Sequence, residues 1–140
     1  MFGNTTRARI VSILADPGSP YAIYFATSTR KVLLKPDQTN GLPWTQGNGG
    51  DLQELTGVGL PSSLVKLALI PNAGRGPNLY AATALGMFRT AKAIGSNSLW
   101  ERMGAGFPDT PISDLQVNPE SRMIYIATYG RGVCYTFDLQ

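Results

Sequence analysis

Histidine is absent from this chain of 140 residues, and cysteine occurs once, at Cys134. Without histidine, Ser-His and Cys-His catalysis, histidine general bases and the usual zinc sites are excluded. A single cysteine excludes an intrachain disulfide and a thiolate metal cluster, so we expect a buried, unreactive thiol. No motif points to a metal ion or any other cofactor, and the sequence predicts neither.

Charge and long apolar runs are also scarce. Charged residues make up 15% of the chain, against roughly 25% in an average soluble protein, and the net charge is +3. The only adjacent basic residues are Arg30 and Lys31, which argues against nucleic-acid binding. No apolar run approaches the length of a membrane span, and the opening MFGNTTRARI lacks a signal-peptide pattern. The sequence therefore predicts a soluble protein of unknown compartment, with no membrane segment.

Glycine and proline, in contrast, are plentiful, with 16 and 10 residues. Between them lie short segments rich in β-branched and aromatic residues, a pattern typical of strands joined by tight turns. The one long interruption is a glycine-rich stretch at 47–62, in which DLQEL could form one short helical turn. The composition and pattern together predict an all-β protein.

One pattern occurs three times along the chain. Each copy runs apolar strand, proline turn, Tyr-x-Ala-Thr strand, short turn and apolar strand, over residues 9–34, 63–90 and 111–137. The repeated tyrosines are Tyr24, Tyr80 and Tyr125. The expected turn prolines are Pro17, Pro71 and Pro119. Successive tyrosines are 56 and 45 residues apart, and three matches in the same order indicate a true internal repeat.

The first two copies continue to a tryptophan segment, LPWTQ with Trp44 and SLWERMG with Trp100, whereas the third stops at Gln140. A period of about 45–55 residues with four short strands per unit is typical of propeller blades. We therefore predict a single partial β-propeller over residues 1–140. Its expected parts are a first blade at about 7–46, the loop at 47–62, a second blade at about 63–103 and an incomplete third blade at about 111–140.

Three blades cannot close a ring, because a propeller needs at least four. An open wedge would expose two apolar sheet faces larger than a soluble monomer normally shows. The sequence therefore predicts a homo-oligomer, with a six-bladed dimer as the simplest symmetric solution. FGNTT of one chain could then supply the outer strand missing from the third blade of the other. The alternative is that the missing blades belong to a longer chain.

The segment WERMGAGFPDTPISDLQVNPESRMIYIATYGRGVCYTF resembles the blades of sialidase-like, Asp-box propellers, whose repeat is also called the bacterial neuraminidase repeat. This group of propellers also looks similar to xyloglucanases and to sortilin-type receptor domains. The resemblance of this chain to the group covers roughly residues 9–137. It implies the propeller fold rather than an activity. The Asp-box, Ser-x-Asp-x-Gly-x-Thr-Trp, is degenerate here: Asp37 stands two places too early before Trp44, and no acid precedes Trp100.

A sialidase of this kind would imply three arginines, a tyrosine nucleophile with a glutamate partner, and an acid. A xyloglucanase would imply two carboxylates on facing loops, one protonated and one ionised. No acid here stands in a matching motif, so no catalytic residue is assigned. The scattered candidates are Asp51, Glu54, Glu101, Asp109, Asp114, Glu120 and Asp138. A glycoside hydrolase-like enzyme, or a fragment of one, whose active site is completed between chains, is the alternative function.

Five residues are candidates for ligand binding. In TYGRGV, Arg131 beside Tyr129 could contact an anion or a sugar, although a β-turn with glycines at positive φ explains the same residues. Arg30 occupies the equivalent turn of the first copy, which predicts a basic rim. Trp44 and Trp100 could stack on sugar rings, but their recurrence favours core packing. We predict a non-catalytic binding or assembly module that recognises a glycan or a protein through rim loops.

Overall fold

The structure is a computed structural model that describes residues 8–35, 53–61, 64–72, 75–90, 98–103 and 110–138. These residues form strands joined by turns, and no helix occurs among them, which confirms the all-β prediction. The strands are β1 (Ile10–Asp16), β2 (Ser19–Thr27), β3 (Val32–Lys35), β4 (Gln53–Glu54), β5 (Leu64–Asn72), β6 (Arg75–Thr83), β7 (Gly86–Thr90), β8 (Glu101–Arg102), β9 (Ile112–Asn118), β10 (Met123–Thr128) and β11 (Gly132–Phe137). Accordingly, the described part of the chain contains no helix with the length and hydropathy that a bilayer-crossing segment needs.

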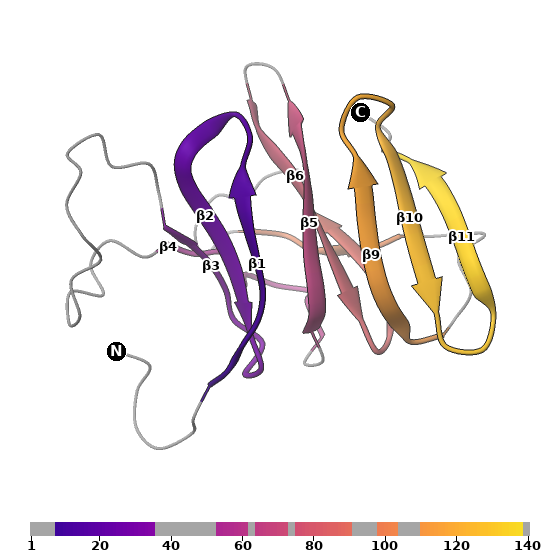
Figure 1. Cartoon of the computed structure of the whole chain (residues 1–140). Helices are drawn as coiled ribbons and strands as arrows, with labels where there is room; N and C mark the ends of the chain where they lie inside the picture. The colour runs from indigo at the N-terminus through magenta and orange to yellow at the C-terminus, as the bar shows by residue number, and fades with distance from the viewer. Residues whose placement is uncertain are drawn as a thin grey trace.

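Each copy of the repeat forms one antiparallel sheet. The first sheet has the order β1-β2-β3-β4, the second β5-β6-β7-β8, and the third β11-β10-β9. Figure 1 shows the three sheets in a row, with β1, β5 and β9 as the neighbouring strands of successive sheets. The described strands therefore form an open row of three sheets, each built from strands adjacent in sequence.

The repeated tyrosines define one face of each sheet, which we call the tyrosine face; the other is the reverse face. On the tyrosine face of the first sheet, Tyr24 and Ala26 are buried against the reverse face of the second sheet, which contributes Leu67, Leu79 and Phe88. Because side chains alternate along a strand, the second sheet has its own tyrosine available on the opposite side. One hydrophobic core thus joins the first two sheets.

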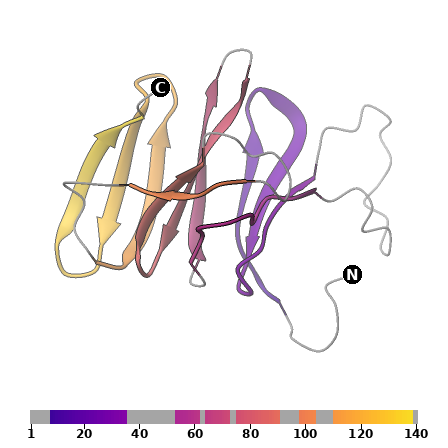
Figure 2. The same ribbon diagram turned by 180° about the vertical axis from the view of Figure 1, so that it is seen from behind.

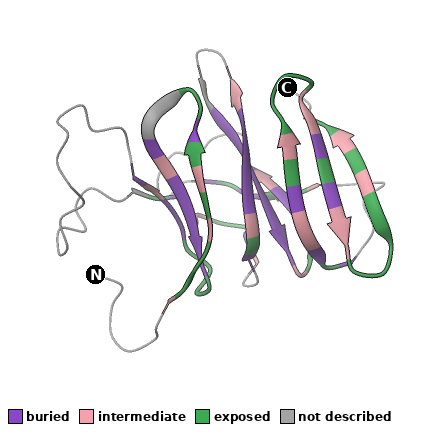
Figure 3. Ribbon diagram, viewed as in Figure 1, coloured by how far each residue is buried: buried purple, intermediate pink, exposed green. Residues whose placement is uncertain are grey.

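A second hydrophobic core repeats this arrangement between the second and third sheets. Tyr80 and Met87 on the tyrosine face of the second sheet pack against Leu115, Ile124 and Ile126 on the reverse face of the third. All five side chains are at most 1% exposed. Burial is concentrated along the middle of the row, as Figure 3 shows. Cys134, expected to be buried, is instead half-buried, because it packs at the border of this core.

The threonine of each Tyr-x-Ala-Thr motif closes the hairpin turn that follows it. These threonines are Thr27, Thr83 and Thr128. In the first hairpin the Thr27 hydroxyl accepts a hydrogen bond from the Lys31 N–H at 3.2 Å. In the second and third, the hydroxyl donates to the carbonyls of Gly86 and Gly132, at 2.7 and 2.9 Å. The backbone N–H and carbonyl groups of a turn need hydrogen-bond partners, and the threonine hydroxyl pairs with one of them in each hairpin. The repeated threonine therefore has a local structural role.

We expect Thr83→Val to lower the free energy of unfolding by about 1–2 kcal/mol. The hydroxyl is fully buried, and it also accepts a hydrogen bond from the Leu85 N–H at 3.1 Å, so valine removes two hydrogen bonds to the backbone. Thr128→Val is the matched control, because its hydroxyl is exposed to water, and we expect a loss below about 0.5 kcal/mol. Urea unfolding measures both variants, and equal losses would contradict the burial argument.

The fourth strand of the first sheet comes from the region predicted as a loop. Gln53–Glu54 forms β4, which pairs with β3 through Leu33 and Leu34, so the expected helical turn in DLQEL is wrong. A strand forms because the outer edge of β3 has unpaired backbone groups that need a partner. In the second sheet β8 follows Trp100, as predicted for that copy. Trp44 and FGNTT lie outside the described residues.

The segments around the two outer strands also pair with each other. Val58 forms a parallel bridge with Leu99: its N–H donates to the Ser98 carbonyl and its carbonyl accepts from the Trp100 N–H, both at 2.9 Å. Gly57 has a φ of 45° and lies directly on the Ser98 carbonyl, where any Cβ would overlap it. Figure 2, seen from behind, shows these segments crossing in front of the sheets. The glycine-rich stretch therefore links the outer edge of the first sheet to the outer edge of the second sheet.

One of the three expected turn prolines is not in a turn. Pro17 and Pro119 lie in the turns after β1 and β9, as predicted, whereas Pro71 is the second-last residue of β5. The pairing of β5 with β6 is irregular between Ile70 and Asn72. Proline lacks the N–H that a regular ladder needs, so it is tolerated at this irregularity, and the strand continues one residue further.

Candidate binding surface

The hairpin turns that follow β2, β6 and β10 lie at the same end of the molecule, the lower end in Figure 1. We call this end the hairpin rim. It carries three of the five residues predicted to bind a ligand: Arg30 in the first turn and Tyr129 and Arg131 in the third. The second turn has no basic residue and instead exposes Leu85, which is 62% exposed. Two basic turns therefore flank an apolar one.

Hydrogen bonds hold the backbone of the third turn, whereas its side chains are exposed. The Tyr129 N–H donates to the Pro111 carbonyl at 3.1 Å, and the Tyr129 carbonyl accepts from the Thr110 hydroxyl at 3.0 Å. The Tyr129 side chain is nevertheless 67% exposed. Arg131 is exposed and forms no ion pair or side-chain hydrogen bond with the residues that the structure describes. A fixed turn thus presents an aromatic ring and a cation to solvent.

The glycines of this turn serve its backbone conformation. Gly130 and Gly132 have φ values of 83° and 75°, in the region that favours glycine, as the turn interpretation predicts. A Cβ at either position would meet no atom within 4 Å, so space does not require glycine here. The ligand-approach interpretation and the turn interpretation are therefore compatible: the backbone needs glycine, and the surface above it is open.

The first turn is basic, but part of its charge is paired. Arg30 has a φ of 69°, and its N–H donates to the Thr27 carbonyl at 3.2 Å. The neighbouring Lys31 forms an ion pair with Glu54 at 3.5 Å, and both side chains are about half exposed. Such a surface pair contributes little to stability, roughly 0–1 kcal/mol, yet it offsets the charge of the lysine. Arg30 is consequently the cation that the first turn offers to a ligand.

Trp100 has a packing role. Its side chain is 3% exposed, lies in the core between the first two sheets, and donates a hydrogen bond from Nε1 to the Leu55 carbonyl at 3.0 Å. A ring in this position has no face open to a sugar. Of the two predicted tryptophans, Trp100 therefore belongs to the core, and Trp44 lies outside the described residues.

Two of the acids considered for catalysis, Glu101 and Asp114, lie on described strands but have different surroundings. Glu101 is exposed on β8. Asp114 forms an ion pair with Lys66 at 2.6 Å, and this hydrogen bond holds the pKa of the Asp114 carboxyl below its usual value. A carboxyl with a lowered pKa is a poor proton donor near neutral pH. Asp51 and Asp109 lie outside the described residues.

Asp138 was one of the scattered candidate acids, and the structure buries it. Its side chain has no exposed surface. Asn78 Nδ2 donates to its two oxygens at 2.9 and 3.1 Å, and both the Tyr80 hydroxyl and Arg122 Nη2 make short contacts with it. Burial raises the pKa of the Asp138 carboxyl, whereas the hydrogen bond from Asn78 acts to lower it. A carboxyl closed off from solvent in this way links sheets rather than meeting a substrate.

Arg122 completes this cluster from the turn between β9 and β10. Besides Asp138, its guanidinium donates to the Pro71 carbonyl at 3.2 Å and to Asn72 Oδ1 at 2.9 Å. Its backbone has a φ of 55°, an uncommon conformation for arginine. The cluster thus fastens the third sheet to the end of β5 and to β6. No local sequence signal marks it, because the bonds that Arg122 and Asp138 make join residues 16 to 60 positions apart.

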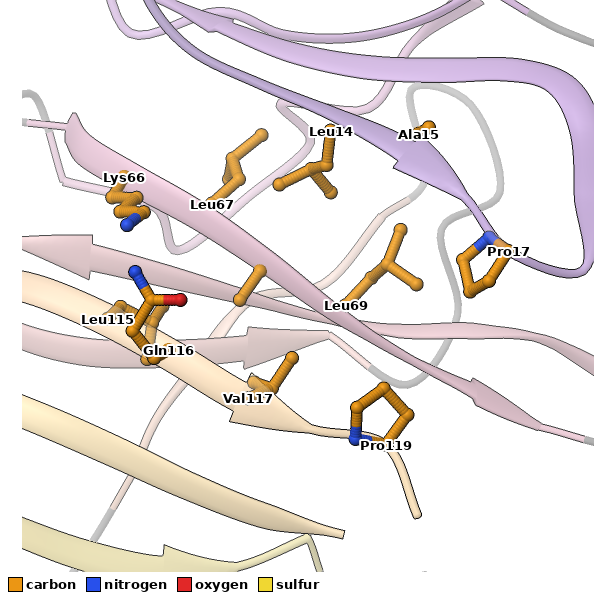
Figure 4. Close-up of a pocket in the computed structure, with 11 residues that line it drawn as sticks. Leu14, Ala15, Pro17, Lys66, Leu67, Leu69, Leu115, Gln116, Val117 and Pro119 are labelled. Atoms are coloured by element: carbon orange, nitrogen blue, oxygen red, sulfur yellow. The ribbon is translucent and has the colours of Figure 1, made fainter.

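A shallow groove of about 330 Å³ runs between the inner strands of the three sheets (Figure 4). Its walls are mostly apolar, and they include Leu14 from β1, Leu67 and Leu69 from β5, and Leu115 and Val117 from β9. Lys66 also borders it, but Asp114 neutralises that charge. The groove therefore lacks the charged groups that distinguish the hairpin rim.

Comparison with the models of known protein families and with curated proteins finds no match to this chain. The likeness to Asp-box propellers therefore depends on the residues that carry it. The assignment of a binding surface likewise depends on the geometry of the hairpin rim.

Proposed function

We propose that this protein is a non-catalytic binding and assembly module, built from propeller blades of the sialidase-like type, that recognises an acidic glycan through its hairpin rim. The observation that carries this proposal is the third turn. Its backbone is fixed by hydrogen bonds, and it presents the exposed Tyr129 ring together with an Arg131 guanidinium that has no partner in the described structure.

The chemistry of these two side chains suits an acidic sugar. A guanidinium donates paired hydrogen bonds to a carboxylate or sulfate, and an aromatic ring packs against the apolar face of a pyranose. Arg30 adds a second cation on the same rim, and the net charge of +3 attracts a polyanion. Because all these contacts are exposed, the binding free energy must depend strongly on ionic strength.

We expect Arg131→Ala to weaken binding to heparin, a sulfated glycan, by about tenfold, which corresponds to one lost charge-assisted hydrogen-bonding group of about 1.4 kcal/mol. Arg30→Ala should weaken it less, and the double variant should lose both contributions. Isothermal titration calorimetry at two salt concentrations measures the effect. Binding of the unaltered protein should itself decrease at the higher salt concentration.

Two controls separate specific recognition from general attraction. Arg131→Lys keeps the charge but loses the planar donor pair, so an intermediate affinity indicates a guanidinium contact. Glu120→Gln removes a negative charge from the exposed turn between β9 and β10, away from the hairpin rim, and should leave affinity within about twofold. If Arg131→Ala has the same affinity as the unaltered protein, or if no heparin binding occurs at low salt, the rim is not the binding surface.

A further inference from the structure

Three side chains, Tyr125, Val133 and Ile13, are exposed although their counterparts in the other repeats are buried. The pairing register makes Tyr125 of the third sheet equivalent to Tyr24 and Tyr80. Tyr125 is 40% exposed, whereas Tyr24 and Tyr80 are 4% and 0% exposed. All three occupy tyrosine faces, but only the first two faces are covered by a following sheet. Tyr125 is therefore exposed because none of the described sheets packs against it.

The neighbouring strand shows the same difference more strongly. Val133 on β11 pairs with Ala127, as Met87 pairs with Ala82 and Val32 with Ala26. Val133 is 73% exposed, against 1% for Met87 and 0% for Val32. Tyr135 and Phe137 extend this apolar surface along β11 on the same face, at 64% and 52% exposed (Figure 3). An apolar face of this kind usually marks an interaction surface.

The opposite end of the row has the complementary gap. Ile13 on the reverse face of the first sheet is equivalent by register to Leu67 and Leu115. Ile13 is 64% exposed, whereas Leu67 and Leu115 are each 1% exposed, because the tyrosine face of the preceding sheet covers them. Val11, on the same strand, is also partly open. On the same face, however, Phe25 of β2 and Leu33 of β3 are 3% and 6% exposed, so the open part of the reverse face is its β1 side. Among the described residues no sheet packs on that β1 side, as none packs on the tyrosine face of the third sheet.

We propose that these two surfaces bind each other between two copies of this chain, so that the tyrosine face of the third sheet covers the open β1 side of the reverse face of the first sheet in the second copy. The contact is of the kind that the chain already makes twice within itself, from tyrosine face to reverse face. It is head to tail, and two such contacts join two chains into a closed pair. This inference rests on the assembly part of the proposed function and names its interface.

The third sheet is also unfinished at its edge. The first and second sheets each end in a two-residue outer strand, β4 paired with β3 and β8 paired with β7. In the described part of the chain, β11 has no such fourth strand. An apolar strand with an open edge tends to pair with another chain. A second copy seated on the third sheet lies beside this edge as well as on the exposed face.

The experiment is a measurement of solution mass by light scattering over a range of protein concentrations, without any glycan. We expect a species of two 15.0 kDa chains. Val133→Asp and Ile13→Asp should each raise the dissociation constant of that species at least about 100-fold, because either places a charge in an apolar contact. Leu85→Asp is the matched control, since Leu85 is similarly exposed but lies on the hairpin rim, and it should leave the mass unchanged.

Mixing the two interface variants tests the head-to-tail geometry. In a pair formed by one chain of each variant, one of the two contacts joins an unaltered third sheet to an unaltered first sheet, so association should partly return. This recovery also shows that both variants are folded. A single-chain mass for the unaltered protein at every concentration would overturn the proposal, as would a mass above two chains.

An effect of Val133→Asp alone would indicate pairing of third sheet with third sheet, and would overturn the head-to-tail contact. The outcome is independent of glycan recognition. A dimer that does not bind heparin refutes the function of the rim, and a heparin-binding single chain refutes the interface.

Discussion

Asp138→Ala is expected to lower the free energy of unfolding by about 3 kcal/mol, the low end of the loss seen when one partner of a buried ion pair is removed. The carboxyl has no exposed surface, and its removal leaves the Arg122 guanidinium, the Tyr80 hydroxyl and Asn78 Nδ2 without their shared acceptor. Because these groups come from the second and third sheets, the change weakens the contact between those two sheets. Urea unfolding followed by circular dichroism measures it.

Two further variants test whether the loss comes from the buried cluster. Glu120→Ala removes an exposed carboxyl from a nearby turn and should change stability by less than about 0.5 kcal/mol. In the double variant Asp138→Ala with Arg122→Ala, the losses should not add, since the second change removes the charge that the first leaves unpaired. Additive losses, or an Asp138→Ala effect no larger than that of Glu120→Ala, would contradict the ion-pair explanation.

Trp100→Ala should be the most damaging change in the core between the first and second sheets, with a loss of about 3–5 kcal/mol. The ring is 3% exposed within that core, and its Nε1 satisfies the Leu55 carbonyl. Trp100→Phe keeps much of the packed volume and loses the hydrogen bond, so we expect a smaller loss. Thermal unfolding followed by circular dichroism avoids dependence on the tryptophan signal itself.

The matched control for this change is Tyr129→Ala, which removes another aromatic ring, but one that is 67% exposed on the hairpin rim. It should change stability by less than about 0.5 kcal/mol. Comparable losses in the two variants would mean that Trp100 does not pack as described. Since heparin binding should be weakened in Tyr129→Ala and unchanged in folded Trp100→Phe, the pair also separates the two roles proposed for aromatic residues.

The sequence predicted the elements whose causes are local. Alternating apolar residues, turn residues and the Tyr-x-Ala-Thr repeat place the hairpins correctly, because strand and turn preferences act over a few residues. The threonine hydroxyl pairs within four residues of its own position, and the turn glycines take the positive φ that the turn interpretation predicts. The exposed positions of Arg30, Tyr129 and Arg131 follow from the same local turns.

The sequence could not predict which residues complete a sheet at its outer edge. Trp44 stood at the position expected from the repeat, yet β3 pairs with Gln53–Glu54 from the glycine-rich stretch. The choice depends on how that stretch passes between sheets and on the close contact of Gly57 with Ser98, which are distant in sequence. Pro71 is similar, because a strand irregularity that accommodates proline has no signature of its own.

By itself, therefore, the sequence determined an all-β chain with three similar units and the turns that expose the candidate ligand residues. Only the tertiary structure decided which equivalent side chains are buried. Tyr24, Tyr80 and Tyr125 have the same local motif, but the third is exposed because none of the described sheets packs against it. It also decided that Asp138 and Arg122 meet. Burial and long-range ion pairing depend on which sheets pack together, and the sequence of one repeat does not specify which sheet packs against it.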